Sequence, residues 1–405
     1  MQMSGAMRSF QHRNYRLFFA SSVVSNIGTW VQRVAQDWLV LQLTHSGTAL
    51  GIVTGLQFLP TLLFSLLGGS IADRFDKRKI LALTNAGGGV VALTLGALVL
   101  MGNVQIWQVY LLAFGLGFAS AIDAPVRQAF SIELVGPDDL QNAVSLNSAN
   151  FNGGRLIGPA LSGLMINAFG TGPSFILNGI SFIAVISSLF MMDPTQLHRK
   201  KRDQDLSVRI RDGFSYLKKR RDLLEVIVVV GAMATFGLNF QITTALMAKE
   251  VFHRGAGSFG LLGTCIAVGS LSGSILATRR ERKPGGQRVM NGAALFGLAS
   301  VGAAFMPTYE TFALALPICG GLAITTMIAA NTTVQMGADP EIRGRVMGIY
   351  MMVLIGGAPF GSPMVGWLAE AIGTRFTIAF GGAVTCLAAL IVLIIGKRSE
   401  ASELK

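Results

Sequence analysis

Apolar residues along the chain form long runs that are separated by short polar or glycine- and proline-rich breaks. A helix needs about 20 mostly apolar residues to cross the hydrocarbon core of a bilayer. Segment 1–16 is polar and basic, and the run that follows is too long for the core of a signal peptide, so we expect no cleavable leader. The runs predict twelve membrane-spanning helices, at 16–42, 48–72, 80–101, 106–130, 143–168, 174–192, 223–247, 257–278, 289–306, 311–334, 346–370 and 376–396.

Composition supports an all-α polytopic membrane protein. Of 405 residues, 51% are hydrophobic and only 13% are charged, whereas ordinary soluble domains have about 25% charged residues. This balance excludes a soluble enzyme and a disordered tail protein. The cysteines are odd in number and lie in apolar runs, so no disulfide framework is predicted; they are Cys265, Cys319 and Cys386.

The positions of lysine and arginine predict the orientation of the spans, because cytoplasmic loops are enriched in both residues. With the N-terminus inside, 28 of the 33 basic residues fall in the two tails and the even-numbered connections. Lys249, Arg254 and Arg375 fall on the other face, and Arg33 and Arg155 lie within spans. We therefore expect a multi-pass protein of the cytoplasmic membrane with both termini cytoplasmic. The same bias explains the net charge of +12 without a nucleic-acid partner.

The spans divide into two sets of six. A polar break at 193–222 separates them and contains an amphipathic stretch from Leu206 to Leu217, so we predict bundles at 1–192 and 223–405 joined by a linker. The halves repeat at an offset of 203 to 204 residues, which predicts two six-helix bundles related by a parallel repeat, a known transporter plan. The repeated glycines are Gly69, Gly154, Gly158 and Gly163 in the first half and Gly273, Gly357, Gly361 and Gly366 in the second.

The loop after the second span has an ordered pattern of charges. Gly69 would allow a neighbouring helix to approach closely, and Asp73 could cap a helix or pair with Arg127, which follows the fourth span. Such a pair would hold one conformation and break in another; the alternative is a basic loop that only sets topology. The candidate residues of this conformational lock are Gly69, Asp73, Arg74, Lys77, Arg78 and Arg127.

The fifth span has small residues at helical spacing and one proline. Small residues make a flat helix face that packs closely, and Pro159 removes a backbone hydrogen bond and kinks the helix. Ordinary helix packing is one interpretation of this face, and a functional motif is the other. The residues concerned are Gly154, Gly158, Pro159, Ser162 and Gly163.

These two segments resemble motifs of the major facilitator superfamily. The loop resembles motif A, with Ile71 and Asp76 as departures and Ala277 in place of the acid in the second-half copy. The fifth span resembles motif C of proton-coupled drug exporters, with Ser162 replacing one glycine. Residues 29–39 and 124–129 look like the branch that includes bacterial enterobactin and macrolide exporters. The resemblance implies the twelve-helix fold of this superfamily and export rather than import.

Charged residues inside a bilayer are costly and indicate function. In the first span, Asn26, Thr29, Arg33, Gln36 and Asp37 share one helical face and could line a cavity together. Arg33 and Asp37 are i,i+4 neighbours that could pair. We expect Asp37 to be the proton-responsive acid, with Arg33 tuning it; a static salt bridge is the alternative.

Arg155 in the fifth span is the other intramembrane cation. It could neutralise Asp123, steer an anionic substrate or reset a protonated acid, and we expect Arg155 and Asp123 to form a charge relay. Glu370, at the end of its span, is expected to cap or snorkel. The four histidines are dispersed in tails and loops, so neither a metal site nor a cofactor is predicted.

The sequence thus predicts a proton-coupled secondary exporter of a small amphipathic molecule, such as a drug, siderophore or metabolite, that works as a monomer in the lipid bilayer. ATP-driven transport is disfavoured because no Gly-x4-Gly-Lys-Ser/Thr loop occurs. The main alternative is a lipid or lysophospholipid transporter of the same fold. A membrane sensor and an intramembrane enzyme are less favoured, because no soluble signalling domain and no nucleophile set are found.

Overall fold

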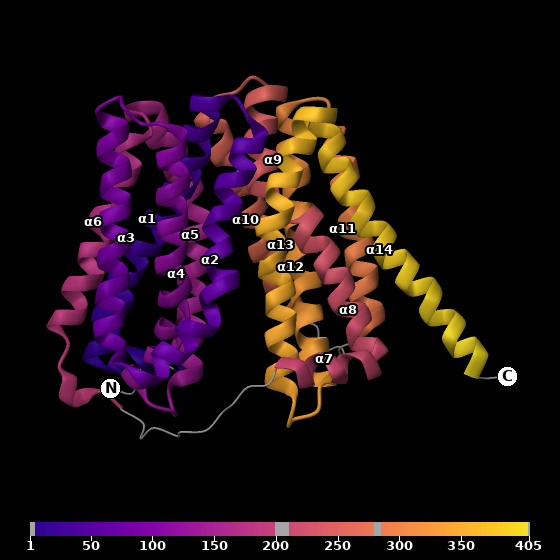
Figure 1. Cartoon of the computed structure of the whole chain (residues 1–405), viewed down its shortest axis with the longest axis horizontal. Coiled ribbons are helices and arrows are strands. Elements are labelled where there is room, and N and C mark those ends of the chain that lie inside the picture. The colour runs from indigo at the N-terminus through magenta and orange to yellow at the C-terminus, as the bar shows by residue number, and fades with distance from the viewer. Residues whose placement is uncertain (1–4, 199–209, 279–284, 404–405) are drawn as a thin grey trace. The chain divides into compact units, whose positions relative to one another are not determined.

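The computed structural model describes residues 5–198, 210–278 and 285–403, and every regular element in these ranges is helical. After a short 3-10 segment, Gly5–Gln11, six long helices follow in the N-terminal half (Figure 1). They are α1 (Arg13–Thr44), α2 (Gly47–Arg74), α3 (Lys77–Leu100), α4 (Ile106–Val135), α5 (Leu140–Phe169) and α6 (Gly172–Met191).

The C-terminal half begins with the amphipathic helix α7 (Ile210–Lys219); the first residues of the predicted amphipathic stretch, 206–209, lie outside the described residues. The predicted span 223–247 is interrupted. It consists of α8 (Arg221–Ala232), a π-turn (Met233–Gly237), α9 (Phe240–Leu246) and a second π-turn (Met247–Val251). The remaining helices are α10 (Ala256–Thr278), α11 (Gly286–Ala304), α12 (Tyr309–Gly337), α13 (Arg343–Ile372) and α14 (Thr374–Glu403).

Each of the twelve predicted spans coincides with a long helical segment. By length and composition, nine of the segments in the described ranges are apolar enough to cross a membrane. The other three are α1, α5 and α11. The first two carry polar residues along much of their length, and α11 begins with the polar residues Gln287, Arg288 and Asn291. The all-α polytopic fold is confirmed.

The chain forms two compact units. The first contains Met1–His45 and Leu56–Asp205, and the second contains Ser46–Gly55 and Leu206–Lys405. The change of unit near residue 205 falls within the linker predicted at 193–222. Because Ser46–Gly55 belongs to the second unit, α2 begins in one unit and continues in the other.

Packing inside each unit follows the internal repeat. In the first unit α3 packs extensively against α6 and α4, and α1 packs against α5. The equivalent pairs in the second unit are α11 with α14, α11 with α12, and α13 with the π-turn at Met233–Gly237. Glycines at equivalent positions of the repeat make close contacts in both units. A Cβ atom at Gly158 would collide with Trp30, and one at Gly361 would collide with the Thr235 carbonyl.

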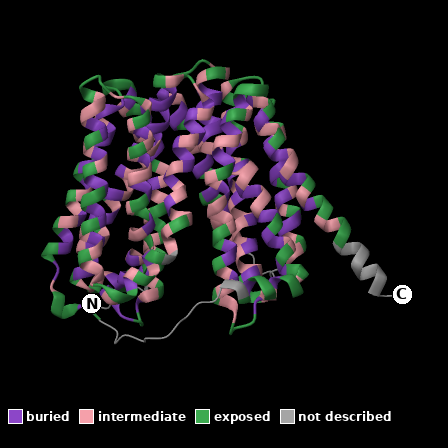
Figure 2. Ribbon diagram, viewed as in Figure 1, coloured by how far each residue is buried: buried purple, intermediate pink, exposed green. Residues whose placement is uncertain are grey.

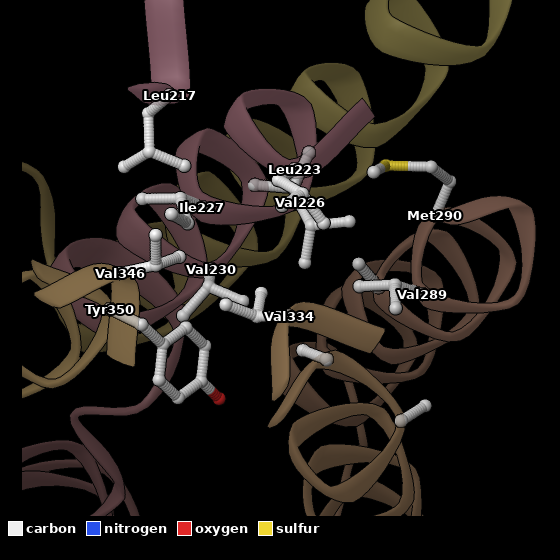
Figure 3. Packing of buried hydrophobic residues seen from close by; sticks show 14 of the residues in the cluster. Leu217, Leu223, Val226, Ile227, Val230, Val289, Met290, Val334, Val346 and Tyr350 are labelled. Carbon is white, nitrogen blue, oxygen red and sulfur yellow. The ribbon is translucent and has the colours of Figure 1, made fainter. Parts of the chain in front are cut away.

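Each unit has its own apolar core. In the second unit, the core gathers side chains from α8, α11, α12 and α13, including Leu223, Val226, Val289 and Tyr350 (Figure 3). Many other apolar side chains are exposed; Leu83, for example, is 70% exposed. Exposed positions recur along the long helices as well as at their ends (Figure 2). Such a surface is costly in water and suits contact with lipid.

The start of α2 is held by Glu370 of α13, which confirms the prediction that this residue caps a helix. Its carboxylate accepts hydrogen bonds from Ser46 Oγ at 2.5 Å, from Thr48 Oγ1 at 2.6 Å and from the Thr48 backbone N–H at 3.0 Å. An acceptor at this end satisfies N–H groups that have no partner within the helix. Gly51 then lets α2 approach α13, because a Cβ there would collide with the Ser362 carbonyl.

Candidate functional site

A cavity of about 610 Å³ lies among α1 to α6, and all of its lining residues belong to the first unit. Cavities of about 300–1,000 Å³ hold drug-sized ligands. The lining combines amides and hydroxyls with four phenylalanines, Phe18, Phe58, Phe151 and Phe182. The charged members of this lining are Arg33, Asp123 and Arg127.

One face of α1 forms a wall of the cavity, as its spacing predicts. Asn26, Thr29 and Arg33 all line it. Gln36 and Asp37 do not: they are 1% and 0% exposed and lie outside the lining. The prediction that all five residues line one cavity is therefore wrong for these two. The polar face of α1 continues beyond the cavity into a region where the helix is buried by its neighbours.

The carboxylate in the cavity wall is that of Asp123. Its Oδ2 accepts from Arg127 Nε at 2.7 Å, and its Oδ1 accepts from Arg127 Nη2 at 3.2 Å, a bidentate pair between i,i+4 neighbours of α4. Thr84 Oγ1 and Asn85 Nδ2 of α3 also donate to Oδ1, at 2.9 and 2.8 Å. Arg127 further donates to Ser22 of α1 at 3.2 Å. The pair thus ties three helices together at the cavity.

This arrangement corrects two predicted pairings. Asp123 binds Arg127 and not Arg155, because a partner one turn away on the same helix is already within reach of both carboxylate oxygens. Arg155 is half-buried on α5 and lies outside the cavity lining. Arg127 in turn is not paired with Asp73, which is exposed at the end of α2.

Basic residues in the first turn of α3 attach this end of the helix to its own unit. Lys77 Nζ lies 2.8 Å from Glu133 Oε1 of α4, and Arg78 donates to the Phe190 carbonyl of α6 at 3.2 Å. Arg74 is exposed. Gly69 does not provide the predicted close approach, since a Cβ there would meet nothing within 4 Å. The adjacent Gly68 does, against Ala121 and Pro125 of α4.

In the second half, residues 279–284, which hold most of the basic residues of the motif A copy, lie outside the described residues. The small residues of α5 form its contact with α1. A Cβ at Gly154 would collide with the Asn26 side chain, and one at Gly158 would collide with Trp30. Ser162 Oγ donates to the Val31 carbonyl at 2.9 Å. Pro159 and Gly163 are also buried. The predicted close packing of this face is confirmed.

Sequence reasoning missed the contributions of α2 and α3 to the cavity. Gln57 and Phe58 of α2, and Thr84 and Asn85 of α3, line it. Gln57, Thr84 and Asn85 are polar residues inside otherwise apolar runs, but an uncharged polar residue in a span can instead bond its own helix backbone. Which of these residues share a cavity depends on the packing of the helices.

Comparison with known proteins places the chain among transporters. A family described as transmembrane secretion effector matches residues 4–404. The staphyloferrin A transporter of Staphylococcus aureus is 25% identical, with 95% of this chain and 96% of that protein covered. The multidrug efflux pump Tap of Mycobacterium bovis is 27% identical (89% and 88% covered), and the enterobactin exporter EntS of Salmonella typhimurium is 20% identical (95% and 93% covered).

The fold also resembles solved transporter structures. The crystal structure of the nucleoside transporter NupG matches with a TM-score of 0.74 at 12% identity, covering 95% of this chain and 99% of that one. At this identity the likeness concerns the fold alone.

Proposed function

We propose a proton-coupled exporter of a small amphipathic molecule, from the premise that the chain belongs to the transmembrane secretion effector family of the major facilitator superfamily. As a member of that family it is a membrane transporter and not an enzyme. Relatives named as a siderophore exporter and a drug efflux pump support this direction of transport. The substrate class we propose is a drug, siderophore or metabolite.

The cavity is the observation on which the proposal rests. Its volume of about 610 Å³ suits one drug-sized molecule. Its lining combines amide and hydroxyl groups with aromatic rings, which suits a solute with both apolar and polar parts. Two lining atoms, Gln57 Nε2 and Asn85 Oδ1, are buried without a hydrogen-bond partner among the described residues. Buried polar atoms of this kind call for water or a ligand.

Proton coupling requires an acid whose surroundings change during transport. Asp123 lines the cavity, and its bonds to Arg127 could be exchanged for a proton when a substrate or a helix movement draws Arg127 away. Asp37 is buried in this conformation, so proton exchange there would need another conformation that admits water. We propose Asp37 as the proton-responsive acid, with Asp123 as the acid that responds to occupancy of the cavity.

The conformational lock is a related proposal. Arg127 is paired with Asp123 in this conformation, and we propose that it exchanges this partner for Asp73 in another. An exposed Asp73 fits a conformation in which the lock is open. Gly69, Arg74, Lys77 and Arg78 would then act by setting the position and charge of this loop.

The membrane setting follows from the charge bias. We propose that both termini face the cytoplasm. We also propose that a single chain suffices for transport, because one chain contains both repeats.

Transport into everted membrane vesicles tests the proposal. Vesicles containing the protein are acidified inside and given a panel of labelled siderophores, drugs and lysophospholipids. We expect accumulation of at least one siderophore or drug, and its loss when a protonophore collapses the gradient. Asp138→Asn, which removes an exposed acid outside the cavity, serves as the matched control and should transport normally. Accumulation that does not depend on the pH gradient would contradict proton coupling. Transport of lysophospholipid alone would favour the lipid alternative.

A further inference from the structure

Arg33 is held in an unusual way for a cation inside a helical bundle. Its guanidinium carbon lies 5.1 Å from the centre of the Trp30 ring and 5.6 Å from the centre of the Phe58 ring. Both are cation–π contacts, in which the cation lies over the face of an aromatic ring. Within the described part of the chain, Arg33 donates no hydrogen bond, although its guanidinium carries five N–H groups. The donors at its edge are therefore available to a molecule in the cavity.

Asp37 interacts electrostatically with Arg33, but no acid at the cavity wall is free to pair with it. Asp123 is the only acid among the lining residues, and it is occupied by Arg127, Thr84 and Asn85. Asp37, one turn from Arg33 on α1, is fully buried and lies outside the lining. In the cavity, the N–H groups of Arg33 are therefore free to bind a solute, whereas both carboxylate oxygens of Asp123 already accept hydrogen bonds.

The surroundings of Arg33 define the shape of the molecule that would bind there. Phe58 and Gln57 are adjacent on α2, and the Nε2 of Gln57 is a second buried donor without a partner among the described residues. Phe151 of α5 also lines the cavity and packs edge-on against Trp30, with ring centres 5.7 Å apart. The donors of Arg33 and Gln57, beside a group of aromatic rings, suit a ligand in which a carboxylate is attached to a flat apolar ring system.

We propose that Arg33 is the anion-recognition residue of the cavity and that the ligand class is an aromatic acid, whose carboxylate binds the guanidinium edge while its ring packs against Phe58 and Phe151. This deepens the proposed function, in that it names the chemical class taken by the same cavity. Arginine suits the role because its planar fork matches a carboxylate bidentately, and because the Trp30 and Phe58 rings contact the guanidinium before the ligand arrives.

Equilibrium binding to the purified transporter in detergent micelles tests the assignment without a pH gradient. The probes are 2-naphthoic acid and its methyl ester, which share the aromatic body and differ in the charge. We expect the acid to bind the wild-type protein about tenfold or more tightly than the ester, as the loss of a hydrogen-bonded charge pair implies. Arg33→Gln should remove most of this preference, because it weakens binding of the acid much more than binding of the ester.

Two further variants keep the test decisive. Arg33→Lys retains the charge but loses the fork, so we expect it to keep only part of the preference for the acid. Arg254→Gln removes another arginine that stacks on an aromatic ring, here Tyr309 at 5.7 Å, but one that is exposed and belongs to the second unit. It should bind both probes as the wild type does.

Equal binding of acid and ester by the wild type, including no binding of either, overturns the proposal. So does an unchanged preference for the acid in both Arg33 variants. The result is separate from the transport assay: if the acid preference depends on Arg33 but vesicles export nothing, the exporter proposal fails and the recognition site stands.

Discussion

The ion pair between Asp123 and Arg127 offers a quantitative prediction, because its two members lie on one helix and line one cavity. Their side chains are 19% and 29% exposed, so the pair is neither fully buried nor a surface pair. Removing one partner of a buried pair costs about 3–5 kcal/mol, whereas exposed pairs contribute about 0.2–1 kcal/mol. For this intermediate exposure we expect each single substitution to lower the free energy of unfolding by about 1–3 kcal/mol.

A double-mutant cycle isolates the pair from its other contacts. Asp123→Asn keeps an oxygen that can accept from Thr84 and Asn85, and Arg127→Gln keeps a donor for Ser22. The double variant removes both charges at once and leaves no uncompensated ion. Its loss of stability should therefore be smaller than the sum of the two single losses, by about 1 kcal/mol or more. Reversible unfolding in mixed detergent micelles measures each corner of the cycle.

The exposed pair between Arg254 and Glu310 is the matched control, since its N–O distance is 3.4 Å and its side chains are 52% and 66% exposed. The same cycle on that pair should give no measurable coupling. If the losses for Asp123 and Arg127 simply add to within about 0.5 kcal/mol, the pair does not stabilise the cavity and the reasoning from its geometry is refuted.

Three further predictions concern transport and packing. Asp37→Asn should abolish pH-gradient-driven efflux in vesicles while the protein stays folded, because a neutral amide cannot exchange a proton; unchanged efflux removes Asp37 from the mechanism. Asp73→Asn should slow turnover, because the lock would lose its acid, and turnover at the wild-type rate would mean that the loop serves topology alone. Gly158→Leu should lower stability by about 1–3 kcal/mol through overpacking against Trp30, and a protein of unchanged thermal stability would contradict that close contact.

Much of the fold could be predicted from the sequence because a bilayer makes hydropathy nearly sufficient. A span must bond all its backbone groups internally, so long apolar runs become helices regardless of their neighbours. The repeat of glycines at Gly154 and Gly357 likewise predicted two related bundles, and both glycines make close contacts in the structure, since only small residues permit such approach. The π-turns near Met233 and Met247 were not predicted, because a one-residue insertion leaves the apolar pattern almost unchanged.

The cavity could be predicted only in part. Spacing correctly placed Asn26, Thr29 and Arg33 on one wall, because the helical period is a local property. It could not say where along α1 the cavity ends, and so it included Asp37. It also assigned the close approach at the end of α2 to Gly69 when the structure has it at Gly68. One residue corresponds to a rotation of about 100° around a helix, which only the neighbouring helices can distinguish.

The sequence by itself determined which segments are helical, how they repeat and which polar residues enter the membrane, because each depends on the residues of one segment. Only the tertiary structure decided which of those polar residues meet. The sequence suggested Asp73 as the partner of Arg127, whereas in the structure Arg127 pairs with Asp123, to which the packing of α3 against α4 also directs Thr84 and Asn85. Partner choice is settled by distances between segments, and such distances are not encoded in any one of them.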